Sequence, residues 1–232
     1  ASHQVKTLCS TCSLRELCLP VGLMPNEFSQ LDAVIRQSRR LKKGEFLFRA
    51  GEPFTSLFAI RAGFFKTTVA SQDGRDQVTG FFMSGICSHT HSCDAVALED
   101  SEVCELPFGH IEELGQNIPS LQTHFFRLLS REIVRDQGVM LLLGNMRAEE
   151  RLAAFLLNLS NRLYSRGFAA NDFILRMSRE EIGSYLGLKL ETVSRTLSKF
   201  HHDGLIKVEH KHIKILEPQA LKKMVSGCTH AM

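Results

Sequence analysis

The sequence has 232 residues, of which 44% are hydrophobic and 23% charged, the composition of a soluble globular protein. No run of about 18 apolar residues is present, which excludes a membrane-spanning helix, and no charged and then apolar leader precedes Cys9, so we do not expect secretion. The net charge of +3 is unevenly distributed, because residues 146–232 hold 14 Lys and Arg against 9 Asp and Glu, which indicates a polyanionic partner.

Three cysteines stand near the start of the chain, at Cys9, Cys12 and Cys18, with the spacing C-x2-C-x5-C. This set is one thiolate short of a four-ligand metal site. Seven cysteines in a chain that is not secreted are more typical of free thiols or metal ligands than of disulfides, and an odd number cannot pair completely. We therefore expect either a distant fourth ligand or a group of another kind. The residues alone favour zinc and an iron–sulfur cluster equally.

The segment from about Leu41 to Phe108 has short stretches of β-forming residues separated by glycines. This pattern predicts an antiparallel roll or sandwich of short strands. Two cysteines in the segment repeat the five-residue spacing, with two histidines between them. We interpret these residues as loop residues rather than a second metal site, and the cysteine near the C-terminus as an incidental thiol: Cys87, Cys93, His89, His91 and Cys228.

A helical pattern follows from about Pro119 to Gly144, roughly 25 residues or about 38 Å of helix. Its apolar stripe is narrow, which favours packing against a second copy of the helix over packing on the roll. The sequence therefore predicts a symmetric homodimer along this helix. The expected interface residues are Phe126, Leu129, Ile133, Asp136 and Met140.

The basic region near the C-terminus contains the most informative motif. Ser178 and Glu181 form an S-x-x-E capping box, which predicts a helix start, and Gly187 suits the left-handed position where that helix ends. A second helix is predicted over about Leu190 to His202, with Leu190 on its buried side. Two short helices joined by a glycine turn are typical of a helix-turn-helix. The following "GLIKVEHKHIKIL" alternates apolar and polar residues, as a two-stranded wing would.

The outer face of the second predicted helix has side chains suited to reading DNA. Arg195 can donate two hydrogen bonds to guanine, Glu191 can accept one from cytosine, and Ser194 can contact a base or a phosphate. We therefore expect this helix to enter the major groove of double-stranded DNA. The alternative is a small helical domain with a solvated charged face. The candidate DNA-binding residues are Lys189, Glu191, Ser194, Arg195, Ser198 and Lys199.

The whole chain resembles the CRP/FNR family of bacterial transcription regulators, through "KKGEFLFRAGEPFTSLFAIRAGFFK", "ERLAAFLLNLSNRL" and "EIGSYLGLKLETVSRTL". The resemblance implies an α+β fold with an N-terminal cyclic-nucleotide-binding-like β-roll, a long dimerisation helix and a C-terminal winged helix-turn-helix. It also implies a cytoplasmic bacterial protein that binds palindromic promoter DNA and RNA polymerase. The implied division is a cluster-binding arm, a sensor roll, the dimerisation helix and the DNA-binding domain, at residues 1–25, 26–118, 119–145 and 146–232.

The three early cysteines narrow the resemblance to the fumarate–nitrate reduction regulator (FNR) branch of this family. Members of that branch hold an oxygen-labile 4Fe–4S cluster on three N-terminal cysteines and one cysteine of the roll. The match at "SEVCELPF" implies that Cys104 is the fourth ligand, beside Cys9, Cys12 and Cys18. With the family taken into account, iron–sulfur is favoured over zinc. The implied function is activation of transcription under anaerobic conditions, when the cluster promotes homodimerisation and DNA binding.

Other roles also come from this resemblance. Asp136 matches an acidic residue of the dimer interface. There the two carboxylates of a dimer repel each other until the bound cluster shifts the equilibrium toward the dimer. Gly74, in "SQDGRDQ", matches a loop that contacts RNA polymerase, and Ser13 falls where the branch tunes access of oxygen. Lys189 stands where the branch usually has a threonine; lysine is a poor N-cap, but it can reach a phosphate.

The sequence departs from the family pattern between Gly85 and Ile86, where it is roughly seven or eight residues short, about the length of one strand. Because loss of a strand from the roll would be costly, we expect that these two residues are not covalent neighbours. Cα atoms about 3.8 Å apart would show a true deletion instead. The phosphate-binding Glu and Arg-Ser of cyclic AMP receptors is not found, so no cyclic nucleotide ligand is expected.

Two other functions stay open. One is a cluster-free regulator of the same family that responds through oxidation of cysteine thiols or through a structural metal. The other is an enzyme, since a roll can house a small-molecule site. The sequence has no G-x-S-x-G, P-loop or G-x-G-x-x-G motif and no convincing acid–base pair, so we predict that the protein is not an enzyme.

Overall fold

The computed structural model describes residues 9, 12, 18, 23–34, 37–70, 76–87 and 92–226. The chain divides into two compact units, residues 1–134 and 135–232. In the described ranges, no helix is both long and apolar enough to cross a membrane. Several residues singled out from the sequence lie outside the described part: Ser13, Gly74, His89, His91, Cys228 and the side chains of Cys87 and Asp136.

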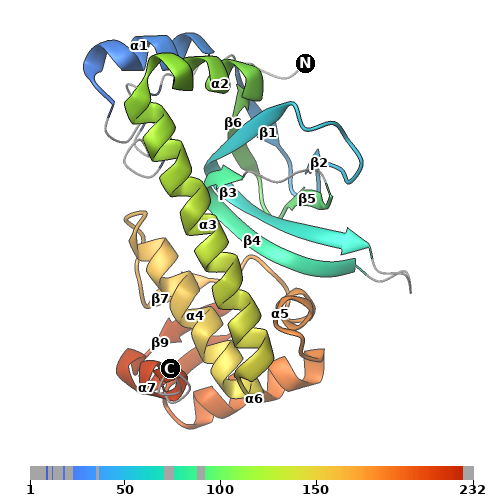
Figure 1. Ribbon diagram of the computed structural model, residues 1–232. Coiled ribbons are helices and arrows are strands. Elements are labelled where there is room, and N and C mark those ends of the chain that lie inside the picture. Colours follow the sequence, from blue (N-terminus) through green and yellow to red (C-terminus); the bar gives the residue numbers. More distant parts are fainter. Residues whose placement is uncertain are drawn as a thin grey trace. The chain divides into compact units, whose positions relative to one another are not determined.

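The first unit is built on one curled antiparallel sheet (Figure 1). The strand order is β1-β6-β3-β5-β2, and β4 pairs with β3 outside this path. This arrangement confirms the predicted roll of the cyclic-nucleotide-binding type. Its strands are β1 (Gln37–Leu41), β2 (Phe46–Phe48), β3 (Ser56–Ala70), β4 (Asp76–Cys87), β5 (Asp94–Ala97) and β6 (Ser101–Pro107). Two helices, α1 (Pro25–Val34) and α2 (Phe108–Asn117), flank these strands in the sequence.

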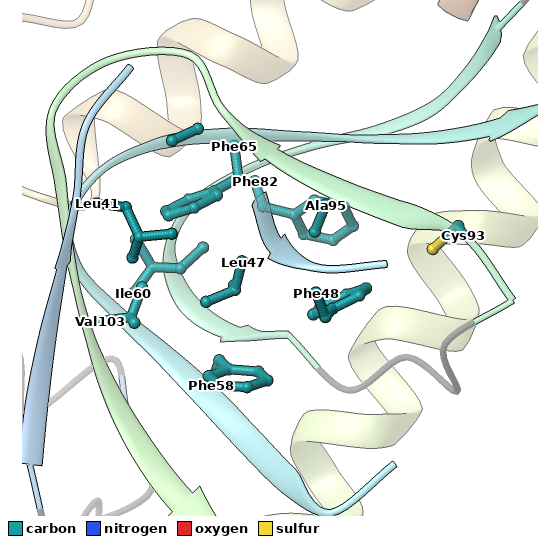
Figure 2. Packing of buried hydrophobic residues seen from close by; sticks show 11 residues of the cluster. Leu41, Leu47, Phe48, Phe58, Ile60, Phe65, Phe82, Cys93, Ala95 and Val103 are labelled. Carbon is teal, nitrogen blue, oxygen red and sulfur yellow. The ribbon is translucent and has the colours of Figure 1, made fainter. Parts of the chain in front are cut away.

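The curl of the sheet is filled by a hydrophobic core rich in phenylalanine (Figure 2). The rings of Phe48 and Phe58 stack with their centroids 6.0 Å apart, and Phe65 and Phe82 are buried in the same core. Cys93 precedes β5 in a bend, and its side chain is buried in the same core. These side chains fix the curvature of the roll from inside.

The expected break between Gly85 and Ile86 is wrong. Strand β4 runs through both residues without interruption, and they pair with Ile60 and Ala59, two successive residues of β3. The shortened roll keeps its hydrogen bonds because β3 is long. One edge of β3 pairs with β4, while the other edge is shared by β6 and β5. In this structure the sheet is thus continuous across the position where the sequence is shorter than the family pattern.

Helix α3 (Pro119–Asn145) matches the long helix predicted from the sequence. The second unit then contains α4 (Ala148–Tyr164), β7 (Asp172–Ile174), α5 (Arg179–Leu186), α6 (Leu190–His202), β8 (Ile206–Glu209), β9 (His212–Ile215) and α7 (Pro218–Ser226). The wing has three strands in the order β7-β9-β8, one more than the sequence pattern indicated. The three-residue strand β7 is too short to show an alternation, which explains why it was missed.

Candidate functional site

Cys104 lies in β6, between Ala59 of β3 and Ser38 of β1 in the ladder. Its side chain is buried in a small core that includes Leu57, Leu106, Ile111 and Leu121. Cys9 and Cys18 pack against the same core. Cys9 and Cys18 therefore share a core with the roll cysteine, although they are more than 80 residues away in the sequence.

The thiols of the arm and the roll act on one another electrostatically. Burial, followed by the negative charge of Cys12, raises the pKa of Cys104 to about 11, against the lowering effect of Arg61. Burial raises the pKa of Cys9 further still, and Cys18, Asp32, Cys104 and Cys12 all add to this shift. Both thiols are therefore protonated at neutral pH unless a cation binds them.

The geometry of the cysteines is not that of a closed metal site. In the part of the chain that the structure describes, no group of three or more His, Cys, Asp or Glu side chains is placed to hold a metal ion. The donor set nevertheless fits one. Cys9, Cys12, Cys18 and Cys104 are in no disulfide, and soft sulfur ligands suit iron–sulfur clusters and zinc alike.

Helix α3 presents two different faces along its length. One face carries Leu121, His124, Phe125 and Leu128, and its apolar members belong to the core that holds the cysteines. The other face is apolar but exposed. Phe126 is 58% exposed, Ile133 59% and Met140 71%, whereas Leu129 is half-buried. The three exposed residues are spaced seven apart, which aligns them on one side of a coiled-coil helix.

Helix α5 begins and ends as the sequence predicts. The Ser178 hydroxyl accepts a hydrogen bond from the Glu181 amide at 3.1 Å, and the Glu181 carboxylate accepts one from the Ser178 amide at 2.6 Å. Gly187 ends the helix with φ of 63°, in the left-handed region. The capping box and the turn glycine are thus confirmed, and together they set the angle at which α6 leaves α5.

Gly183 is a second glycine that this turn requires, and the sequence analysis missed it. It lies within α5, where its carbonyl accepts a hydrogen bond from the amide of Leu188 at 2.8 Å. A Cβ atom at Gly183 would stand 2.6 Å from the carbonyl oxygen of Leu188. The sign of this requirement in the sequence is a glycine five residues before Leu188. The reason for the glycine is visible only in the structure, where the two backbones approach each other closely.

Helix α6 separates a buried face from an exposed one. Val193, Thr196, Leu197 and Phe200 are buried. The candidate base-reading residues lie on the other side: Glu191, Arg195 and Ser198 are exposed and Ser194 is half-buried. Leu190 was expected in the buried stripe, but it is 44% exposed because it occupies the first turn, ahead of the packed segment.

The two lysines near α6 differ in their surroundings. Lys189 is the exposed N-cap residue of the helix and makes no side-chain capping hydrogen bond, as expected for lysine. The Lys199 ammonium lies 2.6 Å from a carboxylate oxygen of Glu149 in α4. Lys199 is therefore engaged within the unit, whereas Lys189 faces solvent beside the candidate base-reading residues.

Arg151, in α4, contacts the ends of α3 and α5 and the connection between α3 and α4, and it was not identified from the sequence. Its guanidinium donates hydrogen bonds to the carbonyl oxygens of Leu143 at 2.7 Å, Met146 at 2.9 Å and Leu186 at 3.0 Å. Leu143 lies in the last turn of α3, and Leu186 is the last residue of α5. These contacts satisfy carbonyls that have no partner within their own helices.

Known sequence families match both units. The cyclic nucleotide-binding domain family matches residues 38–117, and the Crp-like helix-turn-helix domain family matches residues 150–224. The transcriptional activator protein Anr of Pseudomonas aeruginosa is 46% identical over 226 residues, which cover 94% of this chain and 93% of that protein. The chain belongs to the CRP/FNR family. Members of this family are transcription regulators rather than enzymes.

Two further members extend the comparison. The fumarate and nitrate reduction regulatory protein of Escherichia coli is 43% identical and covers 93% of this chain and 89% of its own length. The solved structure of FixK2 from Bradyrhizobium japonicum is 29% identical, with a TM-score of 0.74 over 81% of this chain and 96% of its own. The roll, the long helix and the helix-turn-helix are therefore family features of this CRP/FNR protein.

We expect replacement of Gly183 by alanine to destabilise this CRP/FNR helix-turn-helix. Alanine normally favours a helix interior by about 0.5–1 kcal/mol over glycine. Here the added Cβ meets the backbone of Leu188, so overpacking should dominate and lower the free energy of unfolding by about 1–3 kcal/mol. Urea unfolding of the whole chain, followed by circular dichroism, measures this loss.

Gly144→Ala is the matched control, because it lies near the end of α3 and an added Cβ there meets nothing within 4 Å. Its stability should be unchanged or slightly higher. Equal stability of the two variants would show that the backbone contact at Leu188 does not limit the turn.

Proposed function

We propose that the chain is an oxygen-responsive transcription regulator of the FNR type. In this proposal Cys9, Cys12, Cys18 and Cys104 hold a 4Fe–4S cluster under anaerobic conditions, and the protein then forms a homodimer that binds palindromic promoter DNA. Residues 1–25 act as the cluster-binding arm, 26–118 as the sensor roll, 119–145 as the dimerisation helix and 146–232 as the DNA-binding domain.

The observation that carries this proposal is the packing of Cys9 and Cys18 against the core that contains Cys104. Packing against this core brings Cys9 and Cys18 back to the roll, and together with Cys12 they could supply the ligands for iron that Cys104 alone cannot. The relative from Escherichia coli, named for fumarate and nitrate reduction, supports the same assignment. A bound cluster would supply iron that oxygen can oxidise.

The residues of the chain link this site to the dimer through α3. Leu121, Phe125 and Leu128 pack on the core of the cysteines, so the position of the arm affects the helix. The exposed face of the same helix, with Phe126, Ile133 and Met140, is available to a second copy. Burial of these apolar side chains would stabilise a dimer.

The DNA-binding role falls on α6. Arg195 and Glu191 are exposed and can reach base edges in the major groove, while Lys189 can neutralise a phosphate. In a symmetric dimer the two copies of α6 would meet half-sites about 34 Å apart, one turn of DNA. A contact between the loop around Gly74 and RNA polymerase remains a prediction from the family pattern.

Iron and acid-labile sulfide analysis of anaerobically purified protein tests the proposed function. Equal amounts of iron and sulfide, lost on exposure to air together with binding to a palindromic site, are the expected result. Zinc in place of iron would identify a structural metal. Metal-free protein that binds the palindrome equally well would leave thiol oxidation as the trigger and overturn the cluster assignment.

We expect Asp136→Ala to favour the dimer even without a cluster. Asp136 follows Ile133 by three residues and precedes Met140 by four, so its position in α3 lies on the same seam. Two carboxylates brought together repel each other and lose hydration. Their removal should tighten dimerisation by about tenfold or more, or ~1.4 kcal/mol.

Analytical ultracentrifugation of aerobic protein measures this effect. Gln137→Ala serves as the control, because Gln137 is the next residue of α3 and has no charge. If the Asp136 variant is no more dimeric than the parent or the Gln137 variant, charge repulsion does not set the dimer equilibrium.

A further inference from the structure

The face of α3 that packs on the cysteine core contains one buried imidazole. Leu121, Phe125 and Leu128 of this face make apolar contacts, and His124 lies among them with only 7% of its surface exposed. Its Nε2 atom is 3.1 Å from the backbone carbonyl oxygen of Cys18. The dimerisation helix is thus joined to the backbone of the arm by a specific polar contact.

The chemistry of the two atoms determines the direction of this hydrogen bond. A carbonyl oxygen can only accept, so Nε2 of His124 carries the proton and donates it. Burial lowers the pKa of His124, and the positive charges of Arg131 and Arg127 in the same helix lower it further. The hydrogen bond to Cys18 acts in the opposite direction and raises this pKa. The donor of His124 is therefore directed at the backbone of Cys18.

We propose that His124 is a positioning residue that holds Cys18 on the dimerisation helix and so couples the cysteine arm to the dimer interface. This inference deepens the proposed function, because it names the side chain through which the arm and the helix are connected. Apolar packing alone would let the arm slide over Phe125 and Leu128. A hydrogen bond to a backbone carbonyl fixes one position of Cys18 along the helix.

His124 lies close to the residues of α3 that are proposed to form the dimer interface. Phe126, two residues later, is 58% exposed and begins the apolar stripe proposed to meet the second copy. A displacement of Cys18 therefore acts on the same turn of α3 that starts the dimer face. The helix does not need to bend for this, because a small rotation about its axis changes the direction of Phe126.

The test compares His124→Leu, which keeps an apolar side chain but removes the donor, with His124→Gln, whose amide Nε2 can still donate. His110→Leu is the matched control. His110 is half-buried in α2, and its buried Nδ1 has no hydrogen-bond partner among the described residues. Each metal-free, reduced protein is alkylated anaerobically with iodoacetamide, and mass spectrometry follows the modification of Cys18 relative to Cys12.

We expect Cys18 to react about three to ten times faster in His124→Leu than in the parent, the effect of losing one hydrogen bond. His124→Gln should restore the slow rate, and His110→Leu should leave it unchanged. Because the assay uses metal-free protein, it is separate from the cluster itself. If Cys18 reacts equally fast in all four proteins, the positioning role is wrong even if the parent binds iron. Absence of iron from the parent would overturn the proposed function instead.

Discussion

Replacement of Cys104 by serine should abolish cluster binding. Cys104 belongs to the core against which Cys9 and Cys18 pack, so in the proposed cluster it would be the ligand that ties the arm to the sheet. A serine hydroxyl is a hard ligand that stays protonated near neutral pH and does not replace a thiolate on iron. We expect the iron content of the anaerobic protein to fall to near zero, and serine at Cys9, Cys12 or Cys18 to have the same effect.

Cys93→Ser provides the matched control. Cys93 is equally a buried cysteine of the roll, but it packs among the phenylalanines inside the sheet rather than with the arm. Its variant should retain iron and sulfide at the level of the parent. A Cys104→Ser protein that keeps its full iron content would show that the fourth ligand lies elsewhere.

Exposure to air should weaken binding to a palindromic site by about a hundredfold, and binding to a single half-site far less. A dimer engages both half-sites at once, and such bivalency raises affinity by roughly 10²–10⁴ over one site. Loss of the dimer removes this gain but leaves each α6 intact. Anaerobic fluorescence anisotropy at fixed salt, before and after air exposure, measures both affinities, and fixed salt is essential because phosphate contacts depend on it.

Arg195→Ala gives the contrasting pattern. Arg195 is exposed on the base-reading face of α6, so its loss should cost about 1–3 kcal/mol per half-site in either oxidation state and relax the preference at one guanine. Its effect should therefore appear on the single half-site as well. Equal affinity of the parent for the palindrome before and after air, with the cluster shown to be destroyed, would end the oxygen-sensor interpretation.

Local signals in the sequence predicted those parts of the fold that local chemistry determines. The capping box at Ser178 and the turn at Gly187 depend on residues close in the chain, and both have the predicted geometry. The long helix α3 was predicted because its apolar spacing extends over many turns. The proximity of Cys104 to the arm came from the family pattern, since no local signal relates residues so far apart in the sequence.

Local sequence patterns did not predict the contacts between segments that are distant in the chain. The carbonyl group of Leu188 requires a glycine at position 183. Leu190 is exposed because the first turn of α6 lies ahead of the packed segment. The apolar periodicity of the sequence reveals neither feature. The continuity of β4 was mispredicted because the expectation came from the length of the family pattern, whereas the pairing of β4 with β3 depends on contacts along the whole strand. The hydrogen bond of His124 likewise depends on the return of the arm to α3.

The three hydrogen bonds of Arg151 have a mechanical consequence. Only Met146 and Arg147 separate α3 from α4, and such a short connection would normally act as a swivel. Arg151 holds the carbonyls of Leu143 and Met146 on one side and that of Leu186 on the other. These hydrogen bonds hold the last turn of α3 close to the end of α5, where the turn into α6 begins. Arg151 thus ties the end of α3 to the pair of helices α5 and α6, where the two-residue connection alone would leave a free hinge.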